Sequence, residues 1–179
     1  MSACYPKKTH KFAAKLPKSE NNVLSIDKKN GNTHWSYAIA KEIKNVRMAF
    51  QILDDDKPVP IGYTFILCHM IFDVNMEDFR YKARLVAGGH MTKTPSTTTY
   101  ASVVSSEIVI LGLMLASLNA LEVKCGNVEN AYITVPFTEK VWSILGTEFG
   151  SDAGRKAIIV RALYGLKSVG AALQSHLCI

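Results

Sequence analysis

Two hydrophobic periodicities lie close together in this sequence and set its fold class. Between residues 35 and 50, apolar side chains recur at steps of four, four, three and four, which is the spacing of one helix face. Between residues 80 and 85, apolar and basic side chains alternate, which is the period of a half-buried strand. Helix and strand patterns follow each other without a regular βαβ order. The sequence therefore predicts an α+β fold.

The remaining segments continue this mixed pattern. Ser105 or Ser106 can cap a second helix, and because residues 108–118 are apolar nearly all round, we expect this helix to be buried in the core. Residues 121–125 alternate between apolar and polar side chains and predict a short strand that ends at Gly126. Further strands are expected in 63–74, 79–87, 140–145 and 157–160, followed by a last amphipathic segment.

Positive charge is concentrated at the start of the chain. Residues 1–30 contain seven lysines and carry +5 of the net charge of +6. The stretch is rich in Lys, Ser and Asn, so we predict a basic leader without regular structure over 1–32 and one folded domain over 33–179. A basic leader suits a polyanionic partner. The alternative interpretation is a solvated leader that binds nothing.

Several classes of protein are disfavoured by what the sequence lacks. The four cysteines and five histidines are scattered, without the spacing of a zinc site, so free thiols in a reducing compartment are expected. No secretory signal is recognisable, and the longest apolar stretch, Ile108–Ala116, is too short to span a bilayer. We therefore expect an intracellular protein, cytoplasmic or nuclear, that does not act at a membrane.

Five short blocks occur in a fixed order along the chain. The three strongest are Y-K-A-R-L-V-A-G-G-H at 81–90, N-V-E-N-A-Y at 127–132 and R-A-L-Y-G-L-K-S-V-G-A-A-L at 161–173; W-S-Y-A-I-A-K-E-I at 35–43 and T-Y-A-S-V-V-S at 99–105 are weaker. Together they resemble the reverse transcriptase of copia-type retrotransposons, from about residue 34 to the end. The typical family forms of the strong blocks are K-A-R-L-V-A-[RK]-G, D-V-x-x-A-[FY]-L and A-L-Y-G-L-K-Q-A-P-R-A-W.

The resemblance implies the fingers and the start of the palm of a right-hand polymerase, with an incomplete sheet. The implied family activity is RNA-directed DNA synthesis on an RNA or DNA template–primer, with dNTP as substrate and Mg²⁺ as cofactor. Lys82 and Arg84 would close over the incoming triphosphate, and strand residues two apart do point to one side. Tyr132 matches an aromatic ring that packs under the sugar, and Lys167 matches a block that contacts nucleotide. From the residues alone, the alternative for Lys82 and Arg84 is an edge strand with solvated charges. The alternative for Tyr132 is an aromatic side chain in the core.

The block at 127–132 departs from the family at its first position. The resemblance places a magnesium-binding aspartate where this chain has Asn127, and it makes the backbone carbonyl of Val128 the second ligand. An asparagine oxygen brings no charge to a cation that prefers anionic oxygens. The family's second metal motif, [YF]-x-D-D, does not occur. The third block also departs, with Ser168, Gly170, Ala171 and Leu173 in place of Gln, Pro, Arg and Trp.

The sequence thus predicts a truncated, degenerate reverse transcriptase that is catalytically inactive and binds no magnesium productively. Three alternatives stay open. The chain could be a non-catalytic nucleic-acid-binding module held by its lysines. It could also be a remnant without a role, in which truncation exposes strand edges and apolar surface. A small α/β enzyme unrelated to polymerases is disfavoured because no Gly-rich phosphate loop and no G-x-S-x-G occur. The oligomeric state is not predicted.

Overall fold

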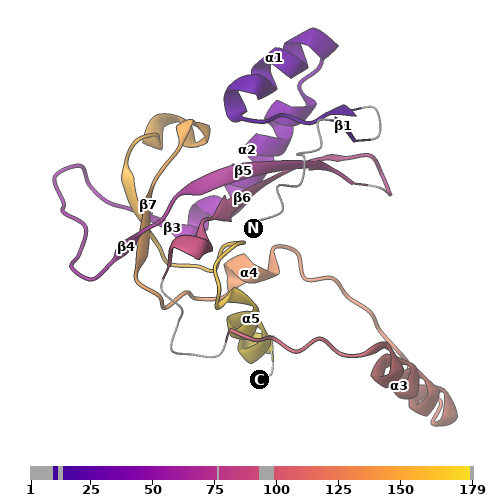
Figure 1. The fold of residues 1–179 in the computed structure, drawn as a ribbon. Helices are drawn as coiled ribbons and strands as arrows, with labels where there is room; N and C mark the ends of the chain where they lie inside the picture. The colour runs from indigo at the N-terminus through magenta and orange to yellow at the C-terminus, as the bar shows by residue number, and fades with distance from the viewer. Residues whose placement is uncertain (1–9, 12–13, 76, 93–98, 178–179) are drawn as a thin grey trace, which may run out of the picture.

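The computed structural model describes residues 10–11, 14–75, 77–92 and 99–177 (Figure 1). The helices are α1 (Glu20–Asn30), α2 (His34–Val46), α3 (Ser106–Leu118), α4 (Ala131–Thr134) and α5 (Val169–Leu177). The strands are β1 (His10–Lys11), β2 (Ala14–Lys15), β3 (Phe50–Ile52), β4 (Thr64–Phe65), β5 (Cys68–Val74), β6 (Tyr81–Ala87), β7 (Val141–Ile144) and β8 (Lys156–Ile159). Single 3₁₀ segments are η1 (Arg47–Ala49), η2 (Gly89–Met91) and η3 (Thr147–Asp152). This mixture confirms the predicted α+β class.

The described strands form three sheets. The largest has the order β3-β8-β7-β4, in which β4 and β7 run parallel and the other two pairs run antiparallel. β5 and β6 form a long antiparallel hairpin, and β1 and β2 form a short one. Figure 1 shows the four-stranded sheet at one end of the β5–β6 hairpin and α1 alongside the hairpin.

α2 packs against one face of the β5–β6 hairpin. The alternation predicted for β6 is confirmed, because Leu85 is fully buried whereas Lys82 and Arg84 are exposed. Trp35 of α2 meets the ring of Phe72 edge-on, with the ring centroids 5.7 Å apart. The buried positions of α2 are Trp35, Ala38, Ile39, Ile43 and Val46. Burying one large aliphatic side chain contributes roughly 1.5–3 kcal/mol, so this contact is a main source of stability.

α1 corrects the expectation for the basic leader. Residues 20–30 form a helix, and its Val23 and Ile26 are buried in the same core as α2. Asp27 is also buried, and its carboxylate accepts the backbone N–H groups of Trp35 and Ser36, at 3.3 and 2.9 Å. These donors belong to the first turn of α2, where the helix itself offers no acceptor. A leader without regular structure is therefore wrong for residues 20–30, and residues 1–9 of it lie outside the described part.

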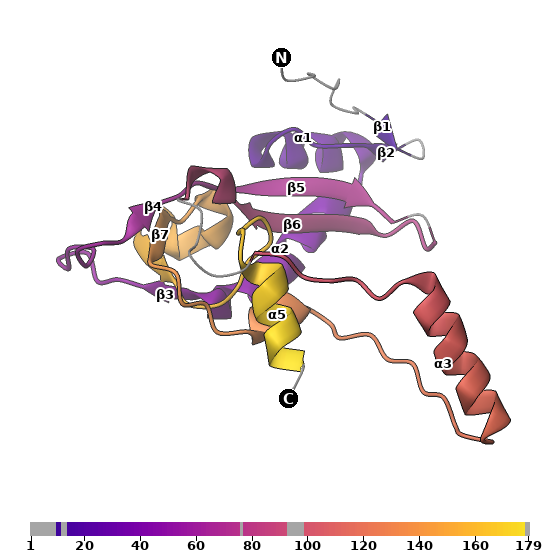
Figure 2. The ribbon, with the colours of Figure 1, turned by 60° about the horizontal axis from the view of Figure 1, so that its bottom comes forward.

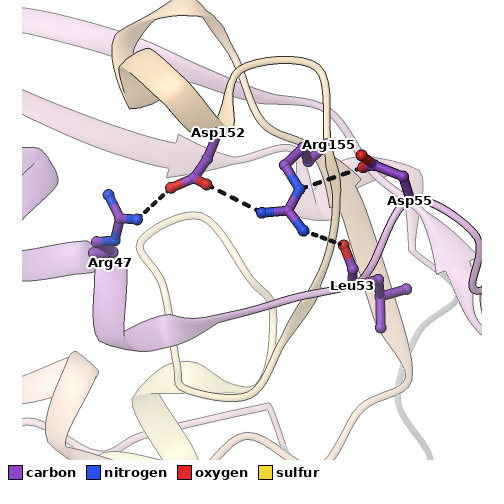
Figure 3. A network of polar contacts seen from close by, with 5 residues as sticks. All are labelled: Arg47, Leu53, Asp55, Asp152 and Arg155. Atoms are coloured by element: carbon purple, nitrogen blue, oxygen red, sulfur yellow. Dashed lines mark hydrogen bonds and ion pairs between the residues drawn. The ribbon is translucent and has the colours of Figure 1, made fainter.

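Asp152 joins the end of α2 to the four-stranded sheet through two arginines (Figure 3). Its carboxylate pairs with Arg47, which follows α2, and lies 3.2 Å from Nη1 of Arg155. Arg155 also donates from Nη2 to the carbonyl oxygen of Leu53 at 3.1 Å. Its Nε lies 3.4 Å from Oδ1 of Asp55, an ion pair without hydrogen-bond geometry. Asp152 is buried, so its ion pairs connect the end of α2 with the start of β8 at a site that is largely shielded from water.

α3 is the clearest departure from expectation. The helix forms over the predicted residues, and the predicted cap is present because Ser105 Oγ accepts the backbone N–H of Ile108 at 3.4 Å. However, none of residues 106–118 is buried, so the expected burial in the core is wrong. Figure 2 shows α3 away from the body, held between two extended stretches. The strand predicted over 121–125 is absent as well, and residues 121–128 lie in exposed coil.

Candidate nucleic-acid interface

Three residues that are far apart in the sequence make successive contacts beside the β5–β6 hairpin, and we call this cluster the stack. Arg84 lies on the exposed face of β6, with Cζ of its guanidinium 5.1 Å from the ring centroid of Tyr164. The ring of Tyr164 meets that of Tyr132 edge-on, with centroids 4.9 Å apart and planes at 89°. Arg84, Tyr132 and Tyr164 come from the blocks at 81–90, 127–132 and 161–173. The fold therefore brings one residue of each strong block to a single place.

Backbone contacts position the strand and the loop that carry this stack. The N–H of Ala87 donates to the carbonyl oxygen of Tyr164 at 2.7 Å. Gly165 has φ of 94°, and a side chain at this position would overlap the carbonyl oxygen of Ala87. A side chain at Gly89 would overlap the carbonyl oxygen of Gly165 in the same way. The two segments meet backbone to backbone, which requires glycine on both sides.

Lys82 extends the positive charge along the same face of β6. It lines a cavity of about 430 Å³ together with Arg84, Lys11, Asp73 and Glu77. Lys11 of β1 donates to Oδ1 of Asp73 at 2.6 Å, and this hydrogen bond holds the pKa of Asp73 below its usual value. Asp73 is also the cross-strand neighbour of Lys82. The cavity thus carries three cations against two carboxylates, and the start of the chain reaches it through Lys11.

Glu42 of α2 supports β6 from its outer edge. Its Oε1 accepts the backbone N–H of Leu85 at 3.0 Å, so a donor on the free edge of the hairpin is satisfied. Burial raises the pKa of Glu42 above its usual value, although the Leu85 hydrogen bond and the charge of Arg84 act in the opposite direction. Glu42 thereby holds the backbone directly beside Arg84.

Replacing Glu42 with glutamine is expected to flatten the pH dependence of stability above about pH 4.5, the ordinary pKa of the group. Because the folded-state pKa is raised, the contribution of Glu42 is full below the unfolded-state pKa and is lost as pH rises through the folded-state pKa. Glutamine keeps an oxygen for Leu85 but does not ionise. Urea unfolding over a pH series measures this, with Glu77→Gln as the exposed control. Parallel pH profiles for wild type and Glu42→Gln would contradict the assignment.

Lys167 is not a free cation in this structure. Its Nζ donates to the carbonyl oxygen of Thr92 at 2.7 Å, and the residue is half-buried. Thr92 is buried and follows η2. The contact ties the loop at 161–167 to the end of the 81–90 block. Nucleotide binding by Lys167 stays a prediction, and in this conformation one of the three N–H donors of its ammonium group is used by the backbone.

In the described part of the chain, no strand leads into Asn127 and Val128. Both are exposed, in the coil that precedes α4, whereas Tyr132 lies within α4. Across the described part of the chain, no three His, Cys, Asp or Glu residues gather into a group that could hold a metal ion. Asn127 and the Val128 carbonyl supply only neutral oxygens, so the residues present do not fit a magnesium ion that bridges phosphates.

Lys82, Arg84 and Tyr132 can be selected from the sequence, but Tyr164, which joins Arg84 and Tyr132, cannot be assigned a role in the same way. Tyr164 was part of the third block, and its place in A-L-Y-G-L-K was the available signal. Asp73 and Glu42 were missed because their roles depend on contacts across the hairpin and between α2 and β6. No local pattern in the sequence reveals such contacts.

Comparisons with models of protein families, with curated proteins and with solved structures find no match for this chain. Within the described ranges, none of the helices combines the length and the apolar character that crossing a bilayer needs.

Proposed function

We propose that the chain is a degenerate copia-type reverse transcriptase unit that retains binding of single-stranded nucleic acid and has lost polymerisation. The observation that carries binding is the contact of Arg84 with the ring of Tyr164, which in turn meets Tyr132 edge-on, with Lys82 on the same face of β6 as Arg84. Each residue of the stack belongs to a different block of the resemblance. Their convergence supports the interpretation of the blocks as parts of one partial fingers-and-palm unit.

The chemistry of the stack suits a flexible polyanion. A guanidinium group over a tyrosine ring is held by the ring quadrupole and keeps donors for phosphate oxygens. Lys82 adds a second phosphate contact, and an aromatic edge beside the cations offers a surface for an unpaired base. Such contacts neutralise phosphates without reading base edges, so binding should depend on salt and show little sequence preference.

Loss of polymerisation follows from Asn127, which stands where the family has its first metal-binding aspartate. A two-metal mechanism needs anionic oxygens shared between the ions. The chain offers neutral oxygens at 127 and 128, on an exposed coil. Template–primer and dNTP are therefore partners by ancestry, and single-stranded RNA or DNA is the partner proposed for the present chain. Magnesium-dependent primer extension by the 179-residue chain would contradict this part of the proposal.

Removing both exposed cations of β6 is expected to weaken binding strongly. In fluorescence anisotropy with a labelled RNA longer than the ~16 nucleotides that one small binding module covers, Lys82→Ala/Arg84→Ala should lower affinity about tenfold or more at low salt. The slope of log affinity against log salt should become shallower by about 1.4, since each phosphate contact on a single strand contributes about 0.7.

The matched control is Lys41→Ala/Lys44→Ala, which removes two exposed cations of α2 and lowers the net charge by the same amount. It should change affinity much less, because only close contacts displace bound counterions. Equal losses in the two variants would indicate attraction to bulk charge and would contradict a site on β6. Undetectable RNA binding by the unaltered chain at low salt would contradict the binding function altogether.

A further inference from the structure

The segment 103–128 exposes more apolar surface than any other part of the described chain; we call it the apolar arm. It consists of α3 and the extended stretches on either side of it (Figure 2). No charged residue occurs from Ile108 to Leu121. The large apolar residues of α3 are between 50 and 79% exposed, at Ile108, Val109, Ile110, Leu111, Leu113, Met114, Leu115 and Leu118. A helix that is apolar all round is normally covered by other groups.

The area of the arm is what a stable protein–protein interface requires. At on the order of 100 Å² for each half-exposed aliphatic residue, α3 presents on the order of 800 Å², whereas the largest apolar patch on an ordinary monomer is about 300–600 Å². A standard interface buries about 800 Å² on each partner. The flanking stretches add Val103, Val104, Leu121, Val123 and Val128, all more than half exposed. Two arms that each bury about two thirds of the surface of α3 and its flanks would form an interface of ordinary size.

We infer that the apolar arm is a self-association element, in which α3 packs against α3 of a second copy of this chain. The contact face is the stripe Leu111, Met114, Leu115 and Leu118, which follows the i, i+3, i+4, i+7 spacing of one helix side. These four positions carry long side chains without interruption, whereas the opposite side includes Gly112 and Ala116. Because the same stripe exists on each copy, the contact is self-complementary about a two-fold axis.

The helix dipole and the position of Glu107 favour an antiparallel pair. Glu107 lies in the first turn of α3, and hydrogen bonds from its own backbone N–H and from Ser105 and Ser106 hold its pKa below the usual value. Lys124 follows the other end of the helix, is exposed and lies 3.5 Å from the carboxylate of Glu122, so that end carries one charge of each sign. An antiparallel arrangement opposes the two helix dipoles and keeps the Glu107 carboxylates of the two copies apart. A parallel arrangement would place these like charges together.

Sedimentation velocity of the full chain at several concentrations tests this inference. The unaltered chain should show a monomer–dimer equilibrium, with the monomer at 19.7 kDa. Leu111→Gln/Met114→Gln/Leu115→Gln should raise the dimer dissociation constant at least ~10-fold, as expected when central apolar side chains are truncated. Glutamine is a good helix former, and no residue of α3 is buried, so the body of the fold should be unaffected. Near-ultraviolet circular dichroism of Trp35 and Trp142 checks that point.

The matched control is Leu24→Gln/Met48→Gln/Leu67→Gln, which replaces the same residue types at exposed positions outside the arm. It should leave the dissociation constant within about threefold of the unaltered chain, because these positions lie outside the interface. A chain that stays monomeric up to its solubility limit would overturn the inference. So would equal effects of the two triple variants, association into species without a defined size, or a monomer that instead binds neutral lipid vesicles through α3.

Discussion

Replacing Gly165 with alanine is expected to lower the free energy of unfolding by about 2–4 kcal/mol. Two effects add at this position. Its φ of 94° lies in a region that residues with a side chain rarely adopt, which costs about 1 kcal/mol or more. In addition, the new methyl group would overlap the carbonyl oxygen of Ala87, a backbone atom of β6 that cannot rotate away. Strain of this kind typically costs about 1–3 kcal/mol.

Gly154→Ala separates the two effects. Gly154 has a similar φ of 82°, but nothing lies within 4 Å of a side chain added there. Chemical denaturation of both variants should give the smaller loss for Gly154→Ala. Gly165→Ala should also weaken RNA binding. The backbone at residue 165 has to move away from Ala87 to make room for the methyl group, and this moves Tyr164 away from Arg84. Equal stability losses would show that β6 and the loop at 161–167 do not approach each other this closely.

The parts of the fold that local periodicity controls could be predicted. The helix face from Trp35 to Val46 and the alternation along β6 each follow from the spacing of apolar residues, and both faces are buried as that spacing requires. The exposure of Lys82 and Arg84 follows from the same alternation. These predictions succeeded because each pattern lies within a single element, and the apolar faces of α2 and the hairpin cover each other.

The predictions that failed concern features that depend on contacts with groups outside the local sequence. The apolar character of α3 predicts that the helix needs to be covered, but it does not say which surface covers it. Residues 121–125 alternate as a strand would, yet among the described residues no neighbouring strand pairs with them. An isolated strand has no stable form in water. The stack of Arg84 on Tyr164 joins residues eighty positions apart, and only the order of the blocks hinted that they belong together.

Removing the carboxylate of Asp152 is expected to have the second large effect on stability. Asp152→Ala should lower the free energy of unfolding by about 2–3 kcal/mol, since breaking a buried ion pair costs about 3–5 kcal/mol and part of this network is solvated. The Asp152 side chain is 11% exposed, whereas Arg47 is about half exposed and can turn to water. Arg155 keeps Leu53 and Asp55 as partners, so its charge is not left alone.

A double-mutant cycle shows whether Asp152 acts through Arg47. If it does, Asp152→Ala/Arg47→Met should cost less than the sum of the two single variants, because each single change already breaks their contact. Asp54→Ala removes an exposed carboxylate paired with Lys57 and should leave the unfolding midpoint unchanged. Additive single effects in the cycle would place the stabilising contact of Asp152 on Arg155 alone. That outcome would mean that apolar packing alone holds α2 against the sheet, and that the ion pair between Arg47 and Asp152 does not contribute to stability.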